Sequence, residues 1–481
     1  MIRTCVIRGA SWVVAWDPVS RRHEYVRDVD IVFCGNRFEG IVDSYQGGYT
    51  DEIDGTDYLI IPGLVNVHSH PASEPLRKGI TDETRSPGFH HSSLYEFLSV
   101  FDNDGEGRVA ALQVAICELL KSGCTTFTDL SSPYDGWLDI LGETGIRAVV
   151  APGFRDARWF TRNGHSLEYE WDLAAGREGF DAAVELITQA ERHPTGRLSG
   201  MVYPAQLDTC SPELLRDSFD YAAQKQLPWQ THAAQSMTEF QELHRRHGRT
   251  PIQWMENIGV LGPHSVLGHA IFLDHHPWLH WTTRTDLETL SRQGVSVAHC
   301  PTVFSRRGIA LRTFGSYRRA GINLGLGTDT YPHNFLEEMR TALSHARLIA
   351  QTVDDLNTSD VFDAATIGGA RALQRDDIGR IAPGCKADFA MIDLTHPSMR
   401  PMREPLRSLL YVAAERAVDR VYVDGAMVVE NGEVTTIDYE NACGTLEEAQ
   451  RRSLTRTAEL DWAGRNAEQL SPMVYPVGNR P

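Results

Sequence analysis

A short apolar segment that ends in a histidine or an aspartate recurs along this chain, and no other feature constrains the fold as strongly. The first copy, residues 62–70, ends in the pair His68 and His70. Later copies end at His232, His269, His299 and Asp329. Helix-like segments lie between them, including residues 212–224, 238–259 and 285–294. Alternating strands and helices with polar groups at the strand ends predict an α/β fold, a (β/α)8 TIM barrel with its site at the carboxyl-terminal face.

The pair His68 and His70 has the spacing of a metal site. Side chains two residues apart on a strand point to the same face, so both imidazoles can reach one ion. In a chain with 19 histidines such a pair is weak evidence, but ligand-type residues also end other strands. We therefore expect a metal ion bound by His68, His70, His232 and Asp329. Imidazoles with a carboxylate suit zinc, with iron as the alternative.

Both ends of the chain are rich in short strand-like segments, in residues 1–58 and 378–436. The second block contains a hairpin signal, residues 420–429, with Asp424 and Gly425 as its turn. We expect one β-sandwich domain built from both ends and a barrel over residues 59–377. The rest, residues 437–481, predicts a helical tail that packs on the barrel or on a neighbouring subunit. We expect a homodimer or a larger homo-oligomer.

Composition limits the partners that the chain can bind. A formal net charge of -18 argues against nucleic acid and against an anionic membrane surface, since phosphate binding relies on Lys and Arg. The first residues lack a secretory-signal pattern, and no stretch is long and apolar enough to cross a bilayer. Eight cysteines without a CxxC motif indicate reduced thiols. We expect a cytoplasmic protein that acts on a small molecule.

Taken in order, these segments resemble the amidohydrolase superfamily, in particular its branch of chlorohydrolases, S-adenosylhomocysteine and guanine deaminases and cytosine-deaminase-like hydrolases. The resemblance runs from the first residues to about Gly432. It implies the barrel, the composite β domain and a metal-dependent hydrolase of carbon–nitrogen bonds other than peptide bonds. The matching motifs are residues 62–70, Thr231-His232-Ala233-Ala234, Gly268-His269-Ala270, Ala298-His299-Cys300-Pro301, Gly327-Thr328-Asp329-Thr330 and residues 378–389.

The resemblance also implies catalytic roles. Asp329 matches the carboxylate that takes a proton from a metal-activated water and returns it to the leaving group. His269 matches the histidine that ligates the metal or holds that water, and it would steady the developing negative charge, with His299 as a further candidate. Binuclear relatives bridge their ions with a lysine at the end of the fourth strand, but residues 198–206 contain no lysine. One divalent ion is therefore expected.

Gln235 departs from the deaminase pattern. Many deaminases of this branch carry a glutamate there, which passes a proton to the leaving amine, whereas an amide only forms hydrogen bonds. Either Asp329 or Glu239 protonates the leaving nitrogen, or the reaction is not a ring deamination. The leading hypothesis is hydrolysis of an amide, urea or carbamate-like bond in a small heterocyclic or aromatic molecule. The alternatives are a heterocycle deaminase or dehalogenase and a non-catalytic oligomeric scaffold.

Loops above the strand ends are expected to select the substrate. Arg306 and Arg307 are adjacent in such a loop and suit an anionic group, although an arginine pair is also a common surface feature. The candidate substrate-binding residues are Gln235, His299, His91, Arg306 and Trp159.

Overall fold

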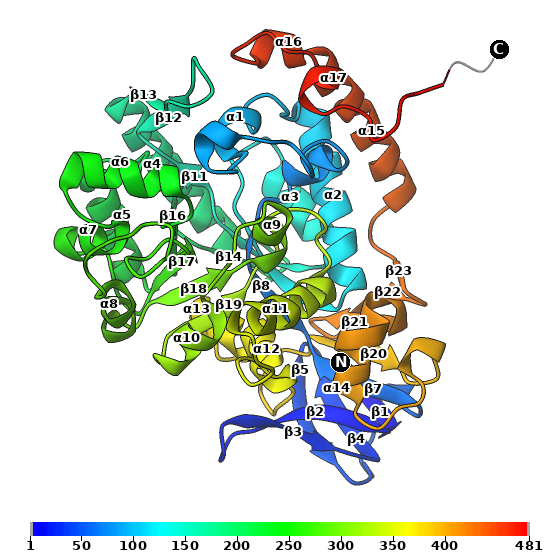
Figure 1. The fold of residues 1–481 in the computed structure, drawn as a ribbon. Helices are drawn as coiled ribbons and strands as arrows, with labels where there is room; N and C mark the ends of the chain where they lie inside the picture. The colour runs from blue at the N-terminus through cyan, green and yellow to red at the C-terminus, as the bar shows by residue number, and fades with distance from the viewer. Residues whose placement is uncertain (1–2, 479–481) are drawn as a thin grey trace.

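The computed structural model describes residues 3–478. Strands from the two ends of the chain gather in one β unit at the bottom of Figure 1, and parallel strands with their helices lie above it. The last helices run along the right side of the molecule to its top (Figure 1). Within the described residues, no helix combines the length and apolar character needed to cross a membrane.

The site is built on two parallel sheets of four strands each, in the orders β14-β10-β9-β8 and β16-β17-β18-β19. Isolated bridges join the sheets at both edges, Ser69 with Asp329 and Val202 with Trp229. We call these strands the parallel-strand unit. Its members are β8 Leu64–Ser69, β9 Cys124–Asp129, β10 Arg147–Val150, β14 Leu198–Gly200, β16 Trp229–Ala233, β17 Ser265–His269, β18 Ser296–His299 and β19 Asn323–Leu326.

Helices connect successive strands, as the sequence predicts. The expectation of one helix over residues 238–259 is wrong, because the segment forms two helices. Gly248 ends α6 with φ 66°, and Thr250 caps the start of α7. The helices are α2 Gly105–Lys121, α3 Trp137–Glu143, α4 Leu173–Glu191, α5 Pro212–Lys225, α6 Met237–His247, α7 Pro251–Ile258, α8 Asp286–Gln293, α9 Pro301–Arg306, α10 Phe314–Arg319, α11 Phe335–Ala350, α12 Thr358–Asp363 and α13 Gly369–Ala372.

Short helices and short strands follow the carboxyl-terminal ends of the first parallel strands. The loop after β8 contains η1 Glu74–Arg77, η2 Pro87–Phe89 and α1 Leu94–Phe97. The expected fourth strand, residues 198–206, is interrupted: β14 is followed by β15 Tyr203–Pro204, which pairs with β11 Gly153–Phe154. Between β11 and α4 a hairpin of β12 Ala157–Phe160 and β13 Glu168–Trp171 extends the edge of the molecule (Figure 1).

The β unit consists of two sheets with the orders β5-β4-β1-β6 and β23-β22-β21-β20-β7-β2-β3. Buried side chains from both, such as Ile31, Phe33, Phe389 and Met391, form one apolar core. The first sheet contains β1 Thr4–Ala10, β4 Val29–Cys34, β5 Arg37–Val42 and β6 Asp51–Asp54. The second contains β2 Trp12–Asp17, β3 Arg22–Val26, β7 Tyr58–Pro62, β20 Phe389–Asp393, β21 Val418–Val423, β22 Ala426–Glu430 and β23 Glu433–Val434.

Two details of the β unit bear on the sequence predictions. The Asp424-Gly425 turn joins β21 and β22, with φ 52° and 74° at these residues, so the predicted hairpin is confirmed. Strand β7 pairs with β2 and β20 rather than with the parallel strands. The parallel strands therefore start at Leu64, whereas residue 59 was the expected boundary.

The tail packs on the parallel-strand unit. Helix α15, Tyr439–Thr455, places Leu446 and Ala449 against an apolar cluster that includes Ala110 of α2 and Leu76 of η1. Beyond it lie α16 Thr457–Leu460 and α17 Ala467–Leu470. Trp462 Nε1 donates a hydrogen bond to Glu96 of α1 at 3.0 Å. The tail thus packs on α2 and braces the long loop after β8.

A buried ion cluster joins the β unit to the parallel strands. Arg147 begins β10 and donates from Nε and Nη2 to the two carboxylate oxygens of Asp388, at 2.9 and 3.0 Å. The same Nη2 donates to Asp424 at 2.6 Å, and Lys386 lies 3.3 Å from that carboxylate. Arg147 and Asp388 are almost fully buried. Removing one partner would leave the other charges desolvated and unpaired.

Replacement of this arginine is therefore expected to destabilise the fold. Arg147→Ala should lower the free energy of unfolding by about 3–5 kcal/mol, seen as a lower urea midpoint. Arg177→Ala, which breaks an exposed pair with Asp217, is the matched control and should cost at most about 1 kcal/mol. Equal midpoints for the two variants would show that the buried cluster does not hold the two units together.

Candidate active site

Four predicted ligands meet at the carboxyl-terminal edge of the parallel strands. One ligand atom each of His68, His70, His232 and Asp329 lies within 4.8 Å of the corresponding atoms of the others. His68 Nε2 and His70 Nε2 are both 3.4 Å from Asp329 Oδ1. The Nε2 atoms of His70 and His232 are 3.3 Å apart. Residues far apart in the sequence thus form one cluster, because their strands end at the same edge.

The hydrogen bond made by Nδ1 of each cluster histidine determines its tautomer, and with it whether Nε2 can present a lone pair to the cluster. His70 Nδ1 lies 2.9 Å from the carbonyl of Leu130, and His232 Nδ1 lies 2.7 Å from the carbonyl of Ala205. Since a carbonyl oxygen only accepts, both Nδ1 atoms carry the proton. His68 Nδ1 lies 2.6 Å from Gln230 Oε1 and is protonated for the same reason. In the neutral form of each ring, Nε2 therefore presents its lone pair to the cluster.

This arrangement requires a cation. Burial is the largest influence on the pKa of His70 and His232 and lowers both, so these imidazoles are neutral near pH 7. Neutral Nε2 lone pairs 3.3 Å apart and next to a carboxylate repel one another unless a positive charge lies between them. Four ligands at about 2.0–2.2 Å from one ion in tetrahedral geometry would be about 3.3–3.6 Å apart. The cluster therefore has the chemistry of a site for one divalent metal ion.

Asp329 is held as an anion at this edge. Burial alone would raise its pKa, but the neighbouring His269, His68 and His70 lower it well below the usual range. Its backbone is fixed to β8, since Asp329 N donates to the carbonyl of His68 and His70 N donates to the carbonyl of Asp329. Asp329 has φ 59°, a conformation that Asp tolerates better than most residues. The carboxylate is thus aimed at the histidines.

Two glycines make room for His68. A β-carbon on Gly268 would lie 2.6 Å from His68 Cε1, and one on Gly327 would lie 2.6 Å from His68 Cβ. Both distances are far below van der Waals contact. Gly268 and Gly327 stand in the motifs that contain His269 and Asp329. These motifs need glycine because the imidazole of His68 passes directly over their backbones.

His269 and His299 occupy different positions. His269 Nε2 lies 3.7 Å from Asp329 Oδ2, whereas His68 and His70 lie next to Oδ1. Burial lowers its pKa to about 3, so it is neutral. His299 is bound through Nδ1 to Thr313 Oγ1 at 2.8 Å. His299 is thus tied to the start of α10, and His269 is the histidine that adjoins the cluster.

Gln235 and Glu239 follow β16 and differ in their hydrogen-bond partners. Glu239 is fully buried and accepts from the backbone N–H groups of Ala234 and Gln235, both at 2.8 Å. Burial and the neighbouring Asp208 raise its pKa to about 8, against the effect of these two donors. Because both of its oxygens accept from backbone N–H groups, Glu239 holds the loop after β16. Gln235 Nε2 is buried without a hydrogen-bond partner among the described residues.

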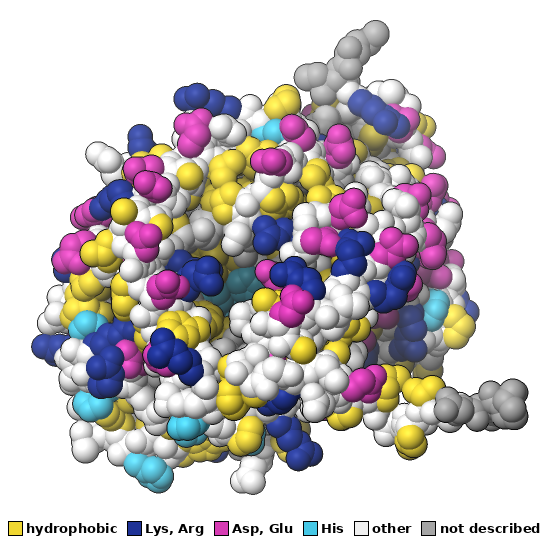
Figure 2. Space-filling model, turned by 90° about the horizontal axis from the view of Figure 1, so that it is seen from above, with side chains coloured by type: hydrophobic (Ala, Val, Ile, Leu, Met, Phe, Trp, Pro, Cys, Tyr) yellow, Lys and Arg dark blue, Asp and Glu magenta, His cyan; other side chains and the backbone are white. Residues whose placement is uncertain are grey.

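A pocket of about 460 Å³ opens on the same face, lined by Pro87, His90, His91, Trp278, Arg307 and Gly308. Figure 2 shows this face from above, hollowed near its middle, with histidine side chains at the base and Lys or Arg side chains beside the hollow. Of the predicted substrate contacts, His91 lines the pocket. Arg306 instead pairs with Asp82 at 3.0 Å, and Trp159 packs on Tyr95. Neither Arg306 nor Trp159 lines this pocket, and a substrate contact for them stays a prediction.

Sequence reasoning missed two supporting residues. Gln230 accepts from His68 and donates to the carbonyl of Val67 at 3.1 Å, which fixes its amide orientation. Asn66 donates to Thr328 Oγ1 at 2.9 Å and accepts from the backbone N–H of His68. Each lies two residues before a ligand on the same strand and therefore on the same face. That spacing was the available signal.

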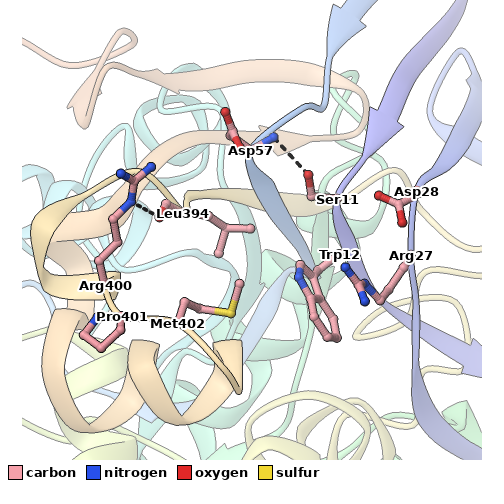
Figure 3. Close-up of a pocket in the computed structure, with 9 residues that line it drawn as sticks. All are labelled: Ser11, Trp12, Arg27, Asp28, Asp57, Leu394, Arg400, Pro401 and Met402. Atoms are coloured by element: carbon pink, nitrogen blue, oxygen red, sulfur yellow. Dashed lines mark hydrogen bonds between the residues drawn. The ribbon is translucent and has the colours of Figure 1, made fainter.

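A second hollow lies elsewhere, in the β unit and the loop after β20 (Figure 3). Trp12 and Arg27 form one side, with the guanidinium 4.3 Å from the indole ring centre. Leu394, Arg400 and Met402 form the other. Its lining includes none of the metal-site histidines, so this hollow is not part of the candidate active site.

Comparisons with known proteins agree with this geometry. The chain is 28% identical over 435 residues to a 5'-deoxyadenosine deaminase of Methanothermobacter thermautotrophicus, covering 89% of this chain and 96% of that protein. It is 28% identical over 444 residues to a 5-methylthioadenosine/S-adenosylhomocysteine deaminase of Pelotomaculum thermopropionicum, covering 89% and 94%. The fold matches an adenosine deaminase from Xanthomonas campestris with bound zinc, with a TM-score of 0.78, 22% identity and coverage of 94% and 98%.

A family model extends the agreement to most of the chain. The model described as the amidohydrolase family matches residues 59–428, which include every residue of the metal cluster. The resemblance inferred from the strand-end motifs is confirmed, and with it an enzyme that hydrolyses carbon–nitrogen bonds other than peptide bonds. The chain belongs to the amidohydrolase family.

Proposed function

We propose that this protein is a zinc-dependent deaminase that removes an amino group from a nitrogen heterocycle of the adenosine type. The observation that carries the proposal is the complete cluster of His68, His70, His232 and Asp329 with His269 beside it. Relatives that match nearly the whole chain are deaminases of modified adenosines. They favour ring deamination over the amide or urea hydrolysis that Gln235 suggested.

The residues around the cluster suit hydrolytic deamination. A zinc ion held by His68, His70, His232 and Asp329 would lower the pKa of a bound water to about 7 and so would supply hydroxide for attack on a ring carbon. Asp329 Oδ2 faces His269 and is the base that takes the proton of this water. Asp329 then returns that proton to the leaving amine, so that water and the amino substrate give a ring carbonyl and ammonia.

Gln235 takes a binding role in this proposal. Its Nε2 is a buried donor with no partner among the described residues, and such a group costs about 1–3 kcal/mol when unsatisfied. A ring nitrogen next to the reacting carbon is an acceptor that would satisfy it. The amide thus orients the ring, while Asp329 alone handles the proton. His269 steadies the oxygen that becomes the carbonyl.

We also propose a specific architecture for the two parts of the fold. The two parallel sheets, bridged at both edges, are the two halves of a (β/α)8 barrel, and the two sheets of the β unit form a sandwich. Support comes from the shared core of the β unit and from the fold match to the zinc-containing deaminase.

An assay for released ammonia tests the function directly. Zinc-loaded protein should release ammonia from 5'-deoxyadenosine or 5'-methylthioadenosine and leave the remainder of the molecule intact, as shown by mass spectrometry. Amides and ureas should not react. Release of a larger amine from an amide or urea, with no ammonia from the adenosines, would restore the other hypothesis.

Loss of one ligand should abolish both metal binding and activity. The wild-type protein should hold about one zinc per chain by inductively coupled plasma mass spectrometry, and His70→Ala should hold less than about a tenth of that. His280→Ala, which changes an exposed histidine, is the control and should keep its zinc. Two ions per wild-type chain, or full zinc content in His70→Ala, would contradict the assigned centre.

Changes at Gln235 should separate binding from metal retention. Gln235→Leu removes the donor and should lower kcat/KM for the adenosine substrate about tenfold or more, with zinc content unchanged. Gln235→Glu should also keep zinc while it alters turnover, because it adds a group that exchanges protons. Gln189→Leu, at an exposed position of α4, serves as the control. Zinc loss in either Gln235 variant would place this residue in the metal site instead.

A further inference from the structure

The pocket formed by loops of the carboxyl-terminal face has an unusual charge balance. It is lined by one arginine, two histidines, a tryptophan, a proline and a glycine, and by no acidic residue among the described lining. The chain as a whole carries a net charge of -18. A pocket lined by a cation without acids is therefore a local exception in this protein, and it favours a negatively charged ligand.

Arg307 supplies the positive charge of this pocket. It is half-buried, and its guanidinium has no Asp or Glu oxygen within 4.0 Å among the described residues. One of its N–H groups donates to the hydroxyl of Ser93, and the others have no side-chain hydrogen bond in the described chain. Its neighbour Arg306 differs, because Asp82, Thr330 and the carbonyl of Tyr331 bind it. The carboxylates of Glu74 and Asp329 act on this guanidinium from a distance, but neither contacts it directly. A partly desolvated guanidinium without a contacting carboxylate can gain from a ligand that supplies one.

The position of Arg307 ties the pocket to the reaction centre. Helix α9 follows β18, and its residue Phe304 packs on the ring of His269 with ring centres 4.7 Å apart. Arg307 lies three residues after Phe304 and caps the end of α9, where its backbone N–H donates to the carbonyl of Phe304. Residues three apart on a helix share a face, about one turn along. Arg307 is thus one helical turn from a residue that touches His269.

Three loops of the carboxyl-terminal face complete the pocket. His90 and His91 come from the loop after β8, Trp278 from the loop after β17, and Arg307 from the loop after β18. These strands also carry His68, His269 and His299. Pockets built by loops that follow the metal-bearing strands are where substrates of such folds bind. Trp278 is 42% exposed and offers an open aromatic face at the rim.

We propose that Arg307 binds an acidic group, a carboxylate or a phosphate, on the part of the substrate that extends away from the reacting ring. The inference rests on the proposed deamination and deepens it: the substrate is a nitrogen heterocycle with an anionic arm. A guanidinium binds either acid through two parallel hydrogen bonds, and the flanking imidazoles of His90 and His91 can add donors. Arg307 is therefore a specificity residue and takes no part in the proton transfers.

Pairs of substrates that differ in one acidic group test this assignment. S-adenosylhomocysteine carries a carboxylate that 5'-methylthioadenosine lacks, and adenosine 5'-monophosphate carries a phosphate that adenosine lacks. Zinc-loaded wild-type enzyme, Arg307→Gln and Arg312→Gln are compared by kcat/KM on all four. Arg312 is an exposed residue of the same segment, so its variant loses the same charge outside the pocket.

Arg307→Gln should lower kcat/KM for the acidic member of one pair about tenfold or more, through KM, and leave the neutral member within about twofold. Arg312→Gln should leave both members within about twofold. The pair that responds identifies the acid as carboxylate or phosphate. An equal effect of Arg307→Gln on both members of each pair overturns the assignment and leaves the deaminase proposal standing.

A binding experiment keeps the two proposals separable. If none of the four compounds releases ammonia, the deaminase proposal fails. Calorimetric titration of the zinc-loaded proteins with S-adenosylhomocysteine and with adenosine 5'-monophosphate then decides the role of Arg307. Binding that is about tenfold weaker in Arg307→Gln than in wild type supports an acid-binding arginine. Equal binding, or no binding to either protein, overturns it.

Discussion

The arrangement of the site depends on a cation bound between four buried electron-donating groups. Without that cation, these four groups would repel one another. Three imidazoles present Nε2 lone pairs to one point because Gln230, Leu130 and Ala205 accept their Nδ1 protons. Asp329 adds a carboxylate whose pKa these histidines hold low. A bound divalent ion converts this repulsion into attraction, so the metal is part of the stability of this edge as well as of its chemistry.

The fold supplies what such a cluster needs, namely several strand ends at one edge. Strands β8, β16 and β19 bring their ligands from distant parts of the chain, and β17 brings His269 beside them. The bridge between Ser69 and Asp329 joins the first of these strands to the segment after the last. The ion cluster around Arg147 anchors β10 to the β unit on one side. On another side, the tail braces the loop that carries His91 through Trp462 and Glu96. Rigid surroundings keep the ligands in place, while loops are left to choose the substrate.

Much of the site could be predicted from the sequence, and the reasons for the misses are physical. Strand-end positions identified the ligands because their spacing follows from strand geometry. The ion pair between Arg306 and Asp82 joins two loops that are far apart in sequence. No local sequence pattern therefore distinguishes Arg306 from Arg307. Likewise, the need for Gly268 and Gly327 arises only where His68 crosses their backbones. Gly248 and Pro251 mark the break between α6 and α7, although the helix-like pattern of residues 238–259 continues across it.

Crystal diffraction of the zinc-loaded protein at the zinc absorption edge tests the metal centre most directly. One anomalous peak per chain is expected, at about 2.0–2.2 Å from the Nε2 atoms of His68, His70 and His232 and from an oxygen of Asp329. Their Nδ1 atoms should keep Gln230, Leu130 and Ala205 as partners. Two peaks, or a single peak bound through Nδ1 or away from these residues, would contradict the single-ion centre.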